Sequence, residues 1–192
     1  MTETGLRERS KARRRAAIIR AAYELFAERG YDATTVADIA AAAEVAPRTV
    51  AMYFPAKQDI ALSRFSEGMT SLGEAIRGRA PGETLTDVLG GWLRGAEVEA
   101  ADPELVALGR RMFAANPGLG ALRAARMTAA IRAGAAVIAA DRGLPPDAAG
   151  PRLAAAAIAA IVMEILDTEP GPGREAAVAA ALRFLKAGIA AL

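Results

Sequence analysis

The sequence contains no cysteine and no histidine. The lack of cysteine excludes disulfides, thiolate catalysis and cysteine-ligated metal sites. The lack of histidine removes the commonest general base and the commonest transition-metal ligand. Asp/Glu or Ser/Lys hydrolase chemistry remains chemically possible, but no such cluster stands out along the chain. We therefore expect no enzymatic activity, no catalytic residues, no metal and no cofactor.

Aromatic side chains and long apolar runs are also scarce. Aromatic residues make up 5% of the chain and hydrophobic residues 53%, so a core would consist mostly of aliphatic side chains and alanine. The longest apolar run, Leu153–Met163, is too short to cross a bilayer. The charged N-terminus lacks the apolar core of a secretory signal. We expect a soluble, cytoplasmic protein without a membrane partner.

Charge is distributed unevenly, although the formal net charge is only +2. Between Arg7 and Arg20 there are seven basic residues against one acidic residue, Glu8, whereas residues 61–192 hold 14 of each sign. Two interpretations of this basic segment remain open. It is either a solvated, frayed terminus or a set of contacts to nucleic-acid phosphates or an adjacent minor groove.

Apolar residues recur at helical spacing throughout, and no run of alternating β-branched residues stands out. The pattern predicts an all-α protein. Glycine and proline positions separate the helical segments. The chain should form about nine helices, near residues 8–29, 35–43, 47–53, 56–77, 84–100, 102–116, 118–141, 152–166 and 174–191.

The segment 31–57 predicts two short helices joined by a tight connection, with a third helix beyond them. Thr34 or Thr35 caps the first helix, and their hydroxyls add donors at a helix N-terminus that can face a phosphate. Pro47 suits the first turn of the second helix. That order of elements is typical of a helix-turn-helix unit, whose second helix enters the major groove. The alternative is a pair of amphipathic core helices with one solvated face.

The second short helix carries the residues that would read DNA. Arg48 and Thr49 lie in its first turn, where such a helix meets base edges, and Arg48 can pair with guanine O6 and N7. Val50 and Phe54 share one face at i, i+4 spacing and are expected to pack inward. Phosphate contacts are expected from the residues that flank this helix and from the arginines of the basic segment: Tyr53, Lys57, Arg13, Arg14 and Arg15.

Three stretches, LFAERGYDATTV, DIAAAAEV and TVAMYFPAKQDI, together closely resemble the N-terminal DNA-binding domain of TetR-family transcriptional regulators. The resemblance covers about 50 residues in the expected order. By position, it implies DNA contacts from Thr34, Thr35, Pro47, Arg48, Thr49, Tyr53 and Lys57. Ala51 departs from the family pattern, which commonly places an aromatic residue there against the DNA backbone.

The resemblance also implies how the rest of the chain works. Residues 1–56 would form the DNA-binding domain with its basic N-terminal arm, and 57–192 a helical effector-binding and dimerisation domain. The larger apolar side chains there can pack in a core or line a cavity for a largely apolar effector. The candidate lining residues are Phe65, Met69, Trp92, Met112, Phe113, Met127 and Met163.

Two aliphatic stripes near the C-terminus predict helix–helix contacts. Within one chain they would complete the core, and the family resemblance makes them a homodimer interface, a four-helix bundle from two subunits. Their residues are Ile158, Ile161, Val162, Ile165, Val178, Leu182, Leu185 and Ile189.

Together these features predict a repressor that a small molecule releases from a palindromic double-stranded operator. It would lie in the cytoplasm, associated with the nucleoid when DNA is bound. The alternative is a helical small-molecule-binding protein without DNA binding, for which Ala51 is the only hint. An enzyme is disfavoured by the missing histidine and cysteine.

Overall fold

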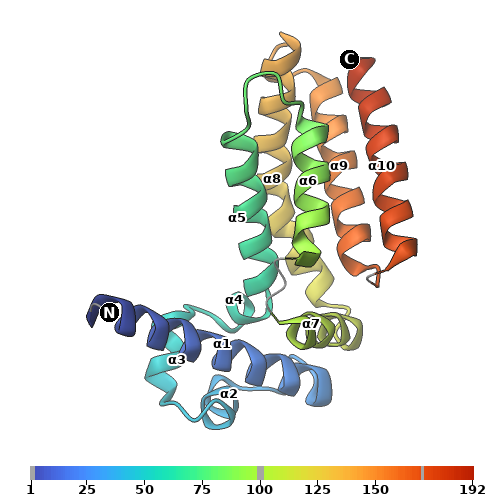
Figure 1. The fold of residues 1–192 in the computed structure, drawn as a ribbon. Coiled ribbons are helices and arrows are strands. Elements are labelled where there is room, and N and C mark those ends of the chain that lie inside the picture. The colour runs from blue at the N-terminus through green and yellow to red at the C-terminus, as the bar shows by residue number, and fades with distance from the viewer. Residues whose placement is uncertain (1–2, 99–101, 170) are drawn as a thin grey trace. The chain divides into compact units, whose positions relative to one another are not determined.

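The computed structural model describes residues 3–98, 102–169 and 171–192, and within them it contains ten helices and no strand. This confirms the predicted all-α class, with one helix more than expected. The helices are α1 (Glu3–Arg29), α2 (Val36–Ala42), α3 (Pro47–Tyr53), α4 (Lys57–Ala61), α5 (Ser63–Arg77), α6 (Leu85–Val98), α7 (Pro103–Ala115), α8 (Leu119–Arg142), α9 (Ala149–Asp167) and α10 (Pro172–Ala190) (Figure 1).

The chain divides into two compact units. The first unit comprises Met1–Ser66 together with Asp102–Arg123, and the second comprises Glu67–Ala101 together with Ala124–Leu192. The first unit therefore contains α7, which lies in the segment that the sequence assigns to effector binding. The functional division at residue 56 stays a prediction, because a compact unit is defined by packing and not by ligand.

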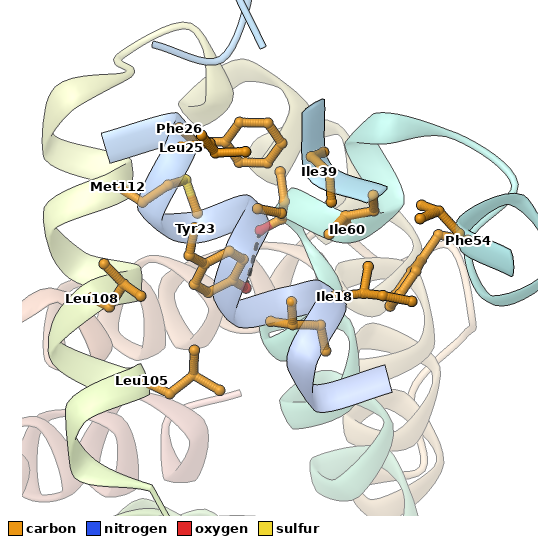
Figure 2. Close-up of a cluster of buried hydrophobic side chains, with 14 of the residues drawn as sticks. Ile18, Tyr23, Leu25, Phe26, Ile39, Phe54, Ile60, Leu105, Leu108 and Met112 are labelled. Atoms are coloured by element: carbon orange, nitrogen blue, oxygen red, sulfur yellow. Dashed lines mark hydrogen bonds between the residues drawn. The ribbon is translucent and has the colours of Figure 1, made fainter. Parts of the chain in front are cut away.

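The core of the first unit forms around α1. Phe26 is fully buried on this helix, and Figure 2 shows α1 side chains directed toward Leu108 and Met112 of α7 on one side and toward Ile39 and Ile60 on the other. The apolar stripe at i, i+3, i+4 spacing explains why α1 serves two neighbours. The core thus joins α2, α3 and α4 to a helix that follows them by about 50 residues in the sequence.

A buried tyrosine accounts for the extra helix. The helix predicted over residues 56–77 is interrupted at Leu62, which separates α4 from α5. The Tyr23 hydroxyl donates to the carbonyl oxygen of Ala61 at 3.3 Å and lies 3.4 Å from the Ser63 hydroxyl oxygen (Figure 2). Since Tyr23 stands 38 residues earlier, local periodicity contains no trace of this contact.

Helix α7 is tied to α1 at both ends. At its start Asp102 accepts a hydrogen bond from the Leu105 backbone N–H at 2.9 Å and forms an ion pair with Arg20. At its end the Asn116 side chain accepts from the backbone N–H of Tyr31 at 2.6 Å and donates to the Phe26 carbonyl oxygen at 2.8 Å. These contacts satisfy backbone groups that helix termini leave unpaired. They fix the register of α7 against α1.

The second unit is a bundle in which α9 packs against α10 and α10 against α6 (Figure 1). Its largest buried cluster contains Leu89 and Leu93 from α6, Val162 and Ile165 from α9, and Leu185 from α10. The helices α5 and α8 each have residues in both units.

This packing requires a revision of the predicted dimer interface. Val162, Ile165, Val178 and Leu185 are at most 4% exposed and belong to the core of their own chain. Leu182 is half-buried, and its side chain lies against α6 at Gly90. Apolar periodicity marks a buried face without telling whether the same chain or another chain buries it.

Candidate nucleic-acid interface and ligand cavity

Helix α3 is held to the first unit by one side only. Pro47 occupies its first turn, as predicted, and Val50 is 1% exposed. The C-capping residue, Phe54, is also buried, which confirms the inward packing expected for these two apolar residues. The anchors leave the remaining face of α3 toward solvent.

That outer face carries the predicted base readers. Arg48 is exposed, and within the described part of the chain it forms no hydrogen bond or ion pair. Thr49 and Tyr53 are half-buried, while Ala51 is exposed and Met52 is 72% exposed. An unengaged guanidinium and an exposed methionine on a short helix are available to a ligand as large as a nucleic acid.

The capping of α2 rests on Thr35 and Asp38. The Asp38 backbone N–H donates to the Thr35 hydroxyl oxygen at 3.1 Å, and the Thr35 backbone N–H donates to the Asp38 carboxylate at 2.8 Å. This reciprocal capping box explains where α2 begins. The Thr35 hydroxyl and then its backbone N–H hold the pKa of Asp38 below its usual range. A phosphate contact from the exposed Thr35 stays a prediction.

Thr34 has a different role from the one predicted. Its side chain is 1% exposed, and its hydroxyl donates to the Gly30 carbonyl oxygen at 2.9 Å. Gly30 adopts a φ of 88°, a left-handed conformation that suits glycine at the end of α1. We therefore revise the assignment of Thr34, because a buried and engaged hydroxyl stabilises the turn after α1 and does not face DNA.

Lys57 is engaged in the same turn. Its Nζ donates to the carbonyl oxygens of Tyr31 at 2.7 Å and Thr34 at 2.8 Å, and it lies 4.2 Å from the centroid of the Tyr31 ring. Burial, followed by the charges of Asp32 and Asp59, raises the pKa of Tyr31. Lys57 thus links the start of α4 to the turn before α2, and its phosphate contact stays a prediction.

The arginines of the basic segment lie on a helix. Arg13, Arg14 and Arg15 all belong to α1, and Arg13 and Arg14 are exposed. The Arg15 guanidinium lies 5.1 Å from the centroid of the Phe54 ring, at the end of α3. Figure 1 shows the N-terminal half of α1 beside α3. This placement favours the phosphate-contact interpretation over the frayed terminus.

A cavity of about 440 Å³ lies within the second unit. Its walls come from α5 between Met69 and Arg77, α8 between Met127 and Val137, and α9 between Ala155 and Val162, with Leu85 of α6. Of the seven predicted lining residues, Met69 and Met127 are part of the wall.

The other five predicted lining residues require a revision. Met112 is fully buried in the first unit, and Phe113 packs against the same core. Trp92 packs against the apolar cluster of the second unit. Phe65 and Met163 are half-buried and are not among the residues that line the cavity. Residue size was the signal behind these predictions, and size does not distinguish core packing from a cavity wall.

Residues 18–63 match the family model described as bacterial regulatory proteins, tetR family. Over these residues the chain is similar to the tetR family. The match confirms the family resemblance and covers α2, α3 and α4 together with most of α1.

A curated relative agrees with this. The chain is 36% identical over 122 residues to the HTH-type transcriptional regulator TcmR of Streptomyces glaucescens. That alignment covers 60% of the chain and 54% of TcmR, so the chain spans about half the length of this relative.

Two solved structures show the same fold over most of the chain. NalD of Pseudomonas aeruginosa, the secondary repressor of the MexAB-OprM multidrug efflux pump, is 21% identical with a TM-score of 0.61, covering 90% of this chain and 96% of NalD. AibR in complex with isovaleryl coenzyme A and operator DNA is 19% identical with a TM-score of 0.50, covering 88% of this chain and 96% of AibR.

Two features lie outside the matched residues, the arginines that the sequence predicted and an asparagine that it did not reveal. Arg13, Arg14 and Arg15 precede the matched residues, and Asn116 follows them by more than 50 positions. Asn116 is the only asparagine in the chain. It stands immediately before Pro117 and Gly118, which suggest only a helix end. Its hydrogen bonds to α1 therefore leave no signal in local sequence.

Proposed function

We propose that this protein is a ligand-responsive, DNA-binding transcriptional regulator, most simply a repressor. The observation that carries the proposal is the outer face of α3. Buried Val50 and Phe54 fix that helix, while Arg48 is exposed and unengaged within the described residues. The family match over residues 18–63 and the operator DNA in the AibR complex support this interpretation.

In this proposal α3 enters the major groove. Arg48 pairs with O6 and N7 of a guanine, an interaction worth about 1–3 kcal/mol of discrimination. Thr49 contacts the neighbouring base edge, and Met52 offers an apolar contact to a thymine methyl group. Arg13 and Arg14 contact phosphates, which position the helix without reading sequence. Tyr53 and Thr35 complete the predicted backbone contacts, while Thr34 and Lys57 hold the turns that orient the two helices.

A second copy of the chain is the proposed dimerisation partner. Among the described residues, only α9 is long and apolar enough, by length and composition, to cross a membrane. Within the apolar 18-residue stretch of this helix, 28% is buried inside the protein. Leu153 on α9 is 71% exposed and Phe184 on α10 is 66% exposed. A homodimer that covers these side chains would present two α3 helices to half-sites about 34–36 Å apart.

The oligomeric state tests this interface. Phe184→Glu should convert the dimer to a monomer in sedimentation velocity, because a carboxylate would lose its water on association. Met52→Glu replaces another highly exposed apolar side chain, on α3, and should leave the dimer intact. A dimer that survives both substitutions would place the interface elsewhere.

The cavity in the second unit is the proposed effector site. A ligand that prefers one spacing of the two α3 helices shifts the population toward it and changes operator affinity accordingly. The isovaleryl coenzyme A in the AibR complex supports a small-molecule effector, and the repressor role named for NalD supports repression. In a cell the protein would act in the cytoplasm, on the nucleoid when bound to DNA.

Binding to duplexes selected from a random library tests the DNA-binding proposal. The wild type should enrich a palindrome, and Arg13→Ala with Arg14→Ala should lower the salt slope by about 0.9 for each lost phosphate contact. Arg132→Ala, at an exposed position of α8, is the matched control and should leave the slope unchanged. No enrichment at low salt would favour the alternative, a small-molecule-binding protein without DNA binding, which Ala51 suggests.

A further inference from the structure

We infer that the cavity takes an aliphatic carboxylate, with its hydrocarbon chain inside and its carboxylate at Arg77. This inference rests on the proposed function, because it names the ligand class of the proposed effector site. The composition of the wall carries it. Apart from Arg77, every residue that lines the cavity is aliphatic, methionine, alanine or glycine.

The apolar wall excludes most ligand chemistry. It contains no hydroxyl, amide or carboxylate side chain, so Arg77 alone offers polar side-chain atoms. The backbone groups of the wall belong mainly to α5, α8 and α9, where helical hydrogen bonds occupy them. A buried ligand hydroxyl or carbonyl would therefore lose its water without gaining a partner, which is unfavourable. The ligand body must accordingly be a hydrocarbon.

The charge of the wall selects an anion. Arg77 is the last residue of α5 and is exposed, so its guanidinium lies where the cavity meets solvent. Within the described part of the chain Arg77 has no ion-pair partner. A guanidinium binds a carboxylate through two parallel hydrogen bonds. At the solvent edge that carboxylate keeps part of its hydration, so pairing does not carry the full cost of burying a charge.

Gly73 allows Arg77 to reach the cavity. A Cβ atom on Gly73 would lie 3.6 Å from Nη1 of Arg77, so the arginine side chain folds back along α5 over the glycine. Both residues belong to the wall. The cationic group and the apolar chamber are therefore part of one site, with the charge at one end and hydrocarbon beyond it.

The volume limits the length of the chain. A cavity of about 440 Å³ falls in the range of small-molecule sites, about 300–1,000 Å³. If each non-hydrogen atom takes about the volume of a liquid water molecule, roughly 30 Å³, the cavity holds about 12–15 of them. Two of those atoms are the carboxylate oxygens, so that number corresponds to a carboxylate of about ten to thirteen carbons. The methionines in the wall allow some variation in shape.

Calorimetric titration of the full-length protein without DNA tests this inference. The probes are decanoate, decanol and decylamine, each below its micelle concentration, because they share a chain and differ in charge. Decanoate should bind at least about tenfold more tightly than decanol, and decylamine should bind least. Equal affinity for decanoate and decanol would overturn the inference.

Three variants locate the binding. Arg77→Gln should remove most of the preference for decanoate over decanol and leave decanol affinity unchanged. Arg152→Gln, at an exposed position of α9 outside the wall, is the matched control and should behave as the wild type. Ala130→Phe fills the cavity from a half-buried position and should abolish binding of both probes while circular dichroism remains helical. Decanoate binding that Arg77→Gln leaves intact would contradict the assignment.

Failure of this inference is distinguishable from failure of the proposed function. A protein that binds a selected duplex but no decanoate refutes the ligand class and retains the regulator. A protein that binds decanoate through Arg77 but enriches no duplex supports the ligand class and refutes DNA binding. The duplex selection and the calorimetric titration use the same purified protein, so a folding defect would appear in both.

Discussion

The two units of this protein are built from different side chains. Of the nine aromatic residues in the chain, only Trp92 and Phe184 lie in the second unit. In the first unit, buried aromatic rings are combined with side chains that hydrogen-bond to distant backbone groups, namely Tyr23, Lys57 and Asn116. The second unit relies on aliphatic residues and alanine, and it encloses a cavity.

The difference corresponds to two physical demands. A helix that reads base edges must be held at a fixed position and angle, and directional hydrogen bonds to backbone groups supply that constraint. A cavity for a hydrocarbon needs volume and a dry wall, which small and aliphatic residues supply without directional contacts. The first unit should therefore respond sharply to substitution, and the second unit should tolerate it.

The largest expected effect comes from two leucines, one in each unit, that differ in how fully they are buried. Leu108→Ala removes a 4% exposed side chain from the first unit and should lower the free energy of unfolding by about 2–5 kcal/mol. Leu72→Ala removes a half-buried side chain that already borders the cavity, so it should cost less than about 2 kcal/mol. Urea denaturation measures both, and equal costs would break the comparison.

Removal of the Asn116 side chain should have the next largest effect. Asn116→Ala leaves the Tyr31 N–H and the Phe26 carbonyl without this partner, a loss of about 1–3 kcal/mol. Hydrogen exchange of the Tyr31 amide should accelerate accordingly. Gln58→Ala, at an exposed position of the same unit, should change stability by less than about 0.5 kcal/mol. Unchanged exchange at Tyr31 would mean that Asn116 does not hold α7 to α1.

Two helical glycines should respond with opposite sign. A Cβ on Gly109 would lie 3.2 Å from the Tyr23 ring, which is buried and hydrogen-bonded, so Gly109→Ala should destabilise the protein by about 1 kcal/mol or more. A Cβ on Gly91 would meet nothing within 4 Å, so Gly91→Ala should stabilise it by about 0.5–1 kcal/mol. Thermal unfolding measures both, and the same sign for both would contradict the contrast between the units.

The smallest expected effect is a pH dependence at Asp102. The Leu105 N–H and then Arg20 hold the pKa of Asp102 below its usual range. Because its folded pKa lies below the unfolded value, the ionised group contributes stability above the unfolded pKa, about 3.9, and loses it as pH falls through the folded value. Unfolding followed from neutral to acidic pH should show a shallower loss for Asp102→Asn. An identical profile would refute a role for this ionisation.

Much of the first unit could be predicted because its signals are local. Pro47 in the first turn of α3, the capping of α2 by Thr35 and Asp38, and the inward packing of Val50 and Phe54 all follow from spacing within a few residues. Short-range chemistry of this kind is visible in one sequence because caps and apolar faces have fixed offsets.

Two of the misses share a cause, which is contact between residues far apart in sequence. Tyr23 breaks the predicted fourth helix at Leu62, and Asn116 attaches α7 to the first unit. Thr34 is a separate case, because the Gly30 carbonyl that accepts from its hydroxyl lies only four residues earlier, in the turn after α1. In the second unit, repeated alanine and aliphatic residues give many faces of equal apolarity, so the sequence could not separate core, cavity and interface.

Duplex selection with the wild type and Arg48→Ala tests the central claim, that α3 reads DNA, most directly. The wild type should enrich a palindrome with one strongly preferred guanine in each half-site, and Arg48→Ala should lose that preference while it keeps the others. Identical preferences in the two selections, or enrichment by neither protein, would contradict the account.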